Sequence, residues 1–547
     1  LGGFLTPFLL STGEVNPVGL FTYLAVLDLG LLVVAWRMDS WMSIEPLSLA
    51  GTYLIYALWL GESYAENYFI PAFLFLVLFW MMFHAVHAIR IIRGVATYSR
   101  FRLGLASLHG ALFYILLYAL LNIDHPDWRV PATLVVAILY GSTSLAARGR
   151  SAGDGVFLQS TLTAIGLVIC ATFIQFKGMA LAQYLSVEAL ALTWAGSQWR
   201  LRSVWGGGVV LFAVAFLFLL GAAGALFASP SEPFTPILNI RAFTFLLLVA
   251  GLALAALLVG RLEQPGARAV RTVLHYAWCG VLLLLISLET NDFFAQMIRH
   301  AGVTREQHLV FLRAMVMPVV WGAYALLLML GGRLEENRPV VSSGLGVLFL
   351  AGCAAIVRGL TYVPIGEMVP VWNERVGLLL LVIAGYGLAR KIVAGRTPVA
   401  GAAAQLAGGI QAGIILLFLV LITGEIWDYY ALAIYRLALV AGPVNIVEEM
   451  SRLQNLRQLF LSAGWLVYSI ILMALGLWRR ARPARIQAII LFGVSILKIF
   501  IYDLSFLDTL YRIFSFVGLG IILLAVSYLY QRYRGIILGS PEATGTP

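Results

Sequence analysis

Apolar residues fill this chain in about eighteen runs of roughly 20 residues each, and short polar segments separate the runs. A run of that length matches the hydrocarbon core of a bilayer, about 30 Å thick, at about 1.5 Å per helical residue. The period-two alternation of a membrane β-barrel is missing from the sequence. The pattern therefore predicts an all-α, polytopic integral membrane protein with about 18 transmembrane helices arranged as repeated helical hairpins. We place the helices at 1–10, 18–37, 43–60, 69–89, 103–121, 130–147, 155–174, 179–198, 204–226, 240–260, 272–288, 308–330, 340–358, 372–390, 402–424, 458–477, 484–501 and 512–531.

The polar gaps between these runs alternate in charge. One set is rich in arginine, as at Arg93 and Arg148, and the other is acidic and aromatic, as at Glu66 and Asp127. Cytoplasmic loops of membrane proteins carry an excess of Lys and Arg, so we place the arginine-rich side in the cytoplasm. The predicted location is a cytoplasmic membrane, crossed many times, with the tail 532–547 and the C-terminus on the cytoplasmic side.

Composition supports a membrane protein and argues against a nucleic-acid partner. The chain is 61% hydrophobic and 11% charged, whereas soluble domains carry about 25% charged residues. The net charge of +10 lies in short turns between helices, where the positive-inside rule puts it. We expect membrane lipids as partners, and other membrane-protein subunits as a second class. The predicted domains are one multi-helix membrane domain, 1–531, and the tail; because Leu1 lies within a predicted helix, we expect a fragment truncated at its N-terminus.

Three predicted helices end alike, which indicates duplication. In 191–200, 326–333 and 471–480 a glycine is followed within four residues by an arginine. We expect an array of hairpins that each descend from outside, turn at a basic cytoplasmic loop and return. Two of the longest segments without a membrane helix, 289–307 and 425–457, are predicted outside, the second as a helix lying flat at the interface because it is rich in aromatic residues.

Two carboxylates interrupt apolar runs near the middle of their helices. Asp28 and Glu188 each lie among Leu, Ala and Val. Charge inside a membrane is costly, so each residue is a functional candidate. One interpretation is a polar clasp to a neighbouring helix through Ser, Thr, Tyr or Arg. The other is a proton or cation site, in which burial raises the carboxyl pKa.

Several charged residues gather near the outer ends of predicted helices. The candidates for this outer-leaflet cluster are Arg313, Arg358, Lys498, Asp503 and Arg512. A salt-bridged turn in which Asp503 bonds to Lys498 or Arg512, together with snorkelling side chains, explains them structurally. The alternative is a pocket for an anionic headgroup or a lipid-linked phosphate.

Histidines and loop acids give weaker signals. His84, His87 and His109 lie at similar depth, as histidines that hold haem or a metal between membrane helices do. No accepted haem or metal motif accompanies them, so we expect no cofactor and no metal site. Asp124 and Asp127 resemble the loop carboxylates of membrane glycosyltransferases, although solvated loop charge explains them as well. Catalytic motifs of the hydrolase, nucleotide-binding and zinc types are missing, which favours a role other than an enzyme.

The C-terminal region is the most distinctive stretch of the chain. Residues 497–505 read Leu-Lys-Ile-Phe-Ile-Tyr-Asp-Leu-Ser, and residues 510–516 read Leu-Tyr-Arg-Ile-Phe-Ser-Phe. Together with the opening stretches 2–10 and 23–28, they resemble the bacterial predicted-membrane-protein family filed as domain of unknown function 2339. The resemblance implies a many-helix bacterial inner-membrane protein, with a soluble N-terminal lead in longer members, and it implies no accepted activity.

Three functions fit these observations. The first is transport or handling of a lipid or cell-envelope precursor, which a cavity lined by Asp28, Glu188 or the outer cations would favour. The second is a non-catalytic scaffold or accessory subunit of a larger membrane complex, favoured by solid helix packing and an apolar face. The third is a membrane-embedded glycosyl- or acyl-transferase, favoured by an outer cavity with carboxylates.

Overall fold

The structure is a computed structural model, and it describes residues 2–9, 16–37, 44–92, 100–148, 154–222, 235–361, 369–395, 400–440, 446–479, 481–502 and scattered positions from 513 to 532. Within these ranges every regular element is a helix. The bounds are α1 Gly2–Leu9, α2 Pro17–Arg37, α3 Ile44–Glu62, η2 Glu66–Tyr68, α4 Phe69–Ile92, α5 Arg100–Asp124, η3 Pro126–Trp128, α6 Arg129–Ala147, α7 Asp154–Gln175, α8 Gly178–Gln198, α9 Arg202–Ala222, α10 Ile240–Gly260, α11 Ala267–Arg299, α12 Val303–Leu334, α13 Arg338–Thr361, α14 Glu374–Ala394, α15 Ala400–Val440, α16 Ile446–Trp478 and α17 Arg482–Ile501.

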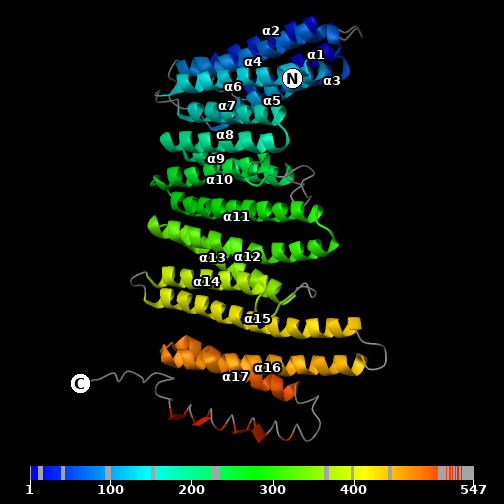
Figure 1. Ribbon diagram of the computed structural model, residues 1–547. Coiled ribbons are helices and arrows are strands. Elements are labelled where there is room, and N and C mark those ends of the chain that lie inside the picture. Colours follow the sequence, from blue (N-terminus) through cyan, green and yellow to red (C-terminus); the bar gives the residue numbers. More distant parts are fainter. Residues whose placement is uncertain are drawn as a thin grey trace, which may run out of the picture. The chain divides into compact units, whose positions relative to one another are not determined.

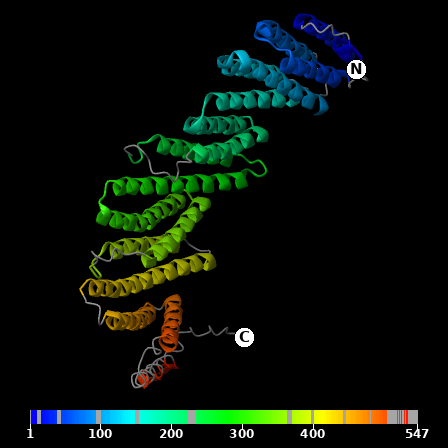
Figure 2. The ribbon, with the colours of Figure 1, turned by 90° about the vertical axis from the view of Figure 1, so that its right-hand side faces the viewer.

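Fourteen of the described helices are long and apolar enough to cross a bilayer. Between 22% and 50% of each such span is buried inside the protein, so broad apolar flanks remain for lipid. The prediction of an all-α, multi-pass membrane protein is confirmed. The helices form two compact units, Leu1–Ala222 with α1–α9 and Ala223–Pro547 with α10–α17. Figures 1 and 2 show the helices of both units.

The first unit is held by aromatic packing between α2, α3 and α4. Phe21 is fully buried and stacks on Tyr56 at a ring-centroid distance of 5.1 Å. The edge of Trp59 meets the same ring at 4.9 Å, and Phe79 of α4 meets it at 6.2 Å. Such offset and edge-to-face pairs add to the van der Waals contact that drives helix association in lipid.

In the second unit, two helices continue well past their predicted ends. The segments 289–307 and 425–457, predicted as outer loops, are instead helical through most of their length: α11 runs to Arg299 and α15 to Val440. The prediction of a separate flat helix in 425–457 is wrong, because α15 is one helix of 41 residues, about 61 Å long at 1.5 Å per residue. The predicted helix 512–531 lies largely outside the described residues.

Three hairpins share one tight turn. The N–H of Leu201 donates to Gly196 at 2.9 Å, that of Asn337 to Gly332 at 2.7 Å, and that of Ala481 to Gly476 at 2.9 Å. A Cβ on Gly332 would lie 2.9 Å from the nitrogen of Val341, one on Gly196 would be closer still to the nitrogen of Trp205, and one on Gly476 would lie 3.1 Å from the nitrogen of Arg485, so each glycine lets the returning helix approach closely. These are the glycines of the three sequence segments that indicated duplication.

Candidate functional site

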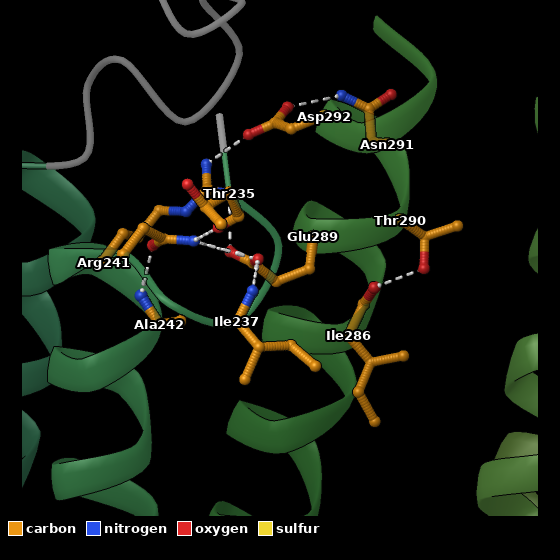
Figure 3. Close-up of polar contacts among 10 residues, drawn as sticks. Thr235, Ile237, Arg241, Ala242, Ile286, Glu289, Thr290, Asn291 and Asp292 are labelled. Carbon is orange, nitrogen blue, oxygen red and sulfur yellow. Dashed lines mark hydrogen bonds and ion pairs between the residues drawn. The ribbon is translucent and has the colours of Figure 1, made fainter. Parts of the chain in front are cut away.

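A polar cluster joins the start of α10 to α11 (Figure 3). Arg241 donates to Glu289 at 2.9 Å and to Asp292 at 2.5 Å. The Asn239 side chain donates to both oxygens of Glu289, at 3.1 and 3.0 Å, and accepts from the N–H of Ala242, capping α10. The N–H of Ile237 donates to Glu289 at 2.8 Å. We call Ile237, Asn239, Arg241, Glu289 and Asp292 cluster A.

The same arrangement recurs between α14 and α15. Arg375 donates to Glu425 at 2.7 Å and forms an ion pair with Asp428. Asn373 donates to both oxygens of Glu425, at 2.9 and 3.1 Å, and caps α14 by accepting from the N–H of Val376. The N–H of Val371 donates to Glu425 at 2.6 Å. Val371, Asn373, Arg375, Glu425 and Asp428 form cluster B.

Both clusters use the same unusual backbone. Ile237 has φ 67° and Val371 has φ 66°, a left-handed conformation that β-branched residues rarely adopt. It turns each N–H toward the carboxylate that the same cluster supplies from the neighbouring helix. The identical geometry in both copies shows a shared structural device, with a backbone strain of about 1–3 kcal/mol that the hydrogen bonds offset.

The duplication extends into the membrane. Trp321 of α12 donates to Ser287 at 2.9 Å, and Trp465 of α16 donates to Thr423 at 2.9 Å, two residues before the glutamate of each cluster. Three residues after each tryptophan, Tyr324 and Tyr468 donate at 2.9 Å to carbonyls of α11 and α15. Helices α10–α13 and α14–α17 are thus two copies of one four-helix repeat, called repeat A and repeat B.

Sequence reasoning missed both clusters, although a signal was present. A proline, a β-branched residue, an asparagine and an arginine occupy positions 236, 237, 239 and 241, and again 370, 371, 373 and 375. A Glu-x-x-Asp pattern follows at 289–292 and at 425–428. The equivalent positions differ by 134 residues in the first pattern and by 136 in the second, because 371 − 237 = 134 and 425 − 289 = 136.

The opposite end of repeat A contains a cavity of about 820 Å³. Its lining comes from the α10–α11 connection, the first turns of α11 and the α12–α13 connection, and includes Arg261, Arg268, Arg271 and Arg338. We call it the arginine pocket. From Ala267 at the pocket to Glu289 in cluster A, α11 rises over about 33 Å, the thickness of a bilayer core. Pocket and cluster A therefore lie at opposite membrane faces.

The two predicted intramembrane carboxylates differ in their surroundings. Asp28 of α2 is fully buried and accepts from Ser48 at 2.5 Å and from Thr52 at 2.6 Å, both on α3. One oxygen of Glu188 accepts from Thr172 of α7, and its other oxygen is buried without a hydrogen-bond partner. Asp28 thus joins two helices through both oxygens, while Glu188 does so through one.

The predicted outer cations come from three helices of the second unit, and their grouping as one cluster stays a prediction. Arg313, Arg358 and Lys498 lie on α12, α13 and α17. The ammonium of Lys498 donates to Ser462 at 2.7 Å and to the carbonyl of Gln458 at 3.1 Å, both on α16. Asp503 and Arg512 lie outside the described residues, and so does the predicted bond of Asp503 to Lys498 or Arg512.

The histidines have separate neighbours. His84 bonds to Thr143 at 3.1 Å, and His109 packs against the rings of Tyr53 and Phe83. The side chain of His87 lies outside the described residues. Among described residues, no three His, Cys, Asp or Glu side chains form a group suited to a metal ion.

The candidate loop acids of the first unit also differ. Asp124 accepts a hydrogen bond from the Tyr64 hydroxyl, whereas Asp127 is exposed. Burial, aided by this bond to a carboxylate, raises the pKa of Tyr64 above its usual range, so the phenol stays protonated as the donor. The contact ties the α3–α4 connection to α5.

Comparison with known proteins agrees with the architecture. Neither curated proteins nor solved structures provide a match. A family model described as predicted membrane protein (DUF2339) matches residues 1–533, nearly the whole chain. With its long apolar helices and duplicated hairpins, this chain belongs to the predicted membrane proteins of DUF2339.

Proposed function

We propose that this protein binds and handles an anionic lipid or a lipid-linked cell-envelope precursor in a bacterial cytoplasmic membrane. The observation that supports this best is the arginine pocket at the end of repeat A. In this proposal the arginine-rich helix ends and the C-terminus face the cytoplasm. The pocket then lies at the level of lipid headgroups, with the apolar flanks of the helices beside it to accept acyl or prenyl chains.

The bonding of the membrane carboxylates supports a headgroup site over an ion pathway. Residues of an ion or proton pathway face a water-filled cavity. Here Asp28 is bonded to Ser48 and Thr52, and the carboxylates of clusters A and B are bonded to Arg241 and Arg375. These charges therefore join helices, whereas the pocket arginines lie around open space.

Lipid analysis of the purified protein tests the proposal. The full chain is purified in a mild detergent, and its bound lipids are extracted and compared with those of the source membrane. We expect enrichment of an anionic or prenyl-linked lipid, with an unrelated multi-pass protein purified in parallel as control. Bound lipids with the same composition as the bulk membrane would refute the proposal.

A scaffold role is the second candidate, and the α15–α16 hairpin favours it. Beyond Glu425, α15 continues for 15 residues, about 22 Å at 1.5 Å per residue. This hairpin exposes large apolar side chains: Tyr429 is 54%, Leu439 69% and Val447 78% exposed. Recovery of one other membrane protein at a fixed ratio, lost on changing Leu439 and Val447 to Ser, would favour the scaffold role.

A further inference from the structure

We infer that the arginine pocket is a binding site for a phosphate group, carried on a lipid headgroup or on a small soluble molecule. The inference names the ligand chemistry of the site on which the proposed function rests. It follows from the arrangement of the arginines, from the polar groups between them, and from a comparison of the two repeats.

The charges of the pocket come from three separate segments. Arg261 follows α10, Arg268 and Arg271 lie on the first turns of α11, and Arg338 begins α13. Glu263 and Glu336 also line the cavity, so four positive and two negative charges leave a net charge of 4 − 2 = +2. A dianionic phosphate would balance this charge.

Within the part of the chain that the structure describes, the four guanidinium groups have no carboxylate partner. Among the described residues, every ion pair of Arg with Asp or Glu involves Arg241, Arg375 or Arg452 instead. Guanidinium groups form paired, charge-assisted hydrogen bonds with phosphate oxygens, and they do so better than ammonium groups. A set of unpaired arginines around one cavity is therefore suited to a phosphate, whereas the arginines of clusters A and B are already bonded.

Polar groups of the pocket are held in place between the arginines. The Asn337 side chain bonds to the ring of His275 at 3.0 Å, and the indole of Trp278 donates to the other ring nitrogen at 3.1 Å. Both His275 and Asn337 are buried. The first turns of α11 and α13 also line the cavity, and the positive ends of these two helix dipoles add favourable potential for an anion.

Repeat B shows that the fold does not require this lining. With the 136-residue spacing of Glu289 and Glu425, Arg268 and Arg271 correspond to Ala404 and Ala407, and His275 corresponds to Gln411. The positive-inside rule acts on both repeats alike, yet only repeat A has arginines at the start of its second helix. Repeat B satisfies this rule with Arg390 and Lys391 near the end of α14, so orientation in the membrane does not require arginines on the second helix of a repeat.

The same comparison supplies a variant that should fold. The double change Arg268→Ala and Arg271→Ala gives repeat A the residues of repeat B. The matched control is Arg390→Ala with Lys391→Ala, which removes two exposed positive charges from the same side of the protein outside the pocket. Correct folding of each variant is checked by its thermal unfolding in detergent.

Binding is measured on the full chain in detergent by calorimetry, with three probes. They are inorganic pyrophosphate, short-chain phosphatidic acid and short-chain phosphatidylcholine. We expect phosphatidic acid to bind, the pocket double variant to bind it at least tenfold more weakly, and the control variant to stay within twofold of the original protein. Binding of pyrophosphate as well would identify a soluble phosphate compound as ligand, and its failure to bind would identify a lipid headgroup.

Three results would overturn the inference: no binding of either phosphate probe, equal weakening in both variants, or phosphatidylcholine binding as tightly as phosphatidic acid. The proposed function fails separately. Pyrophosphate binding at the pocket without enriched lipid in the purified protein would leave the phosphate site and remove the lipid role. Enriched lipid that remains bound to the pocket double variant would leave the lipid role and remove the phosphate site at the pocket.

Discussion

Removal of Arg241 or of Arg375 should destabilise the second unit. Each arginine neutralises two carboxylates that reach it from the next helix. Both arginines are buried, since the Arg375 side chain is 4% exposed and that of Arg241 is 13% exposed. The cost of either removal rises with the burial of the carboxylates that lose their partner, and Asp292 of cluster A is more buried than Asp428 of cluster B.

The magnitude follows from the burial of the carboxylates left behind. Asp292 and Asp428 are 2% and 7% exposed, so neither is solvated by water once its arginine is gone. Breaking a buried ion pair from one side costs about 3–5 kcal/mol. At about 1.4 kcal/mol per factor of ten, Arg375→Ala should raise the unfolding equilibrium constant by roughly a hundred- to several-thousand-fold.

The assay is equilibrium unfolding in mixed micelles, with denaturing detergent as the variable and tryptophan fluorescence as the signal. The double variant Arg375→Ala with Asp428→Asn should lose less unfolding free energy than the two single variants lose in sum, because the second change removes a stranded charge. Single variants whose unfolding free energy lies within about 0.5 kcal/mol of that of the original protein would refute the reasoning, since an ordinary surface substitution changes it by as much. A clearly smaller loss for Arg241→Ala than for Arg375→Ala would refute the argument from burial, because Asp292 is the more buried aspartate.

Three further predictions concern topology, the Asp28 contact and the hairpin turn. Cysteines placed at the exposed positions 66 and 127 should react with an impermeant thiol reagent on intact cells, and a cysteine at 148 should not; the reverse pattern would contradict the charge rule. Asp28→Asn keeps an acceptor for the hydroxyls of α3 and should change the unfolding free energy by less than about 1 kcal/mol, whereas Asp28→Leu should cost about 1–3 kcal/mol per hydroxyl left unpaired, as measured by the same unfolding assay. Gly332→Val should lower stability by about 1–3 kcal/mol because its side chain meets the backbone of α13, while the change of nearby Gly331, which has open space around it, should cost less.

The sequence predicted the bounds of helices well where hydrophobicity alone sets those bounds. The run that forms α10 has no charge after Arg241, and its predicted span, 240–260, equals the observed one. Prediction failed at Glu425 and Asp428, where the sequence predicts the start of an outer segment with a separate flat helix. Their charge is neutralised by Arg375, 50 residues before Glu425, and only a comparison of 370–375 and 425–428 with their equivalents in repeat A indicates that pairing. The helix therefore continues where composition indicates a loop.

For the candidate sites too, the sequence identified individual residues but not the partners that the fold brings to them. A clasp for Asp28 was one of two readings of the sequence, but its partners Ser48 and Thr52 become evident only when α2 and α3 pack together. The sequence did not indicate the arginine pocket, for another reason. Arginines in cytoplasmic turns are expected in any membrane protein, so their convergence on one cavity required the fold.

The four-helix length of each repeat has a consequence for how such chains can change. A segment with an even number of membrane crossings starts and ends on the same side of the bilayer. Gain or loss of one whole repeat would therefore leave every remaining loop in its original compartment, and the tight glycine turns that recur from hairpin to hairpin offer matching points for such an exchange. Gain or loss of a single hairpin would also preserve sidedness, and the α10–α11 hairpin would keep Arg241 with Glu289 and Asp292, but it would separate Trp321 and Tyr324 of α12 from their acceptors on α11. The four-helix repeat is thus the smallest part with an even number of crossings that keeps both its ionic cluster and these tryptophan and tyrosine contacts, and it is the natural unit of duplication.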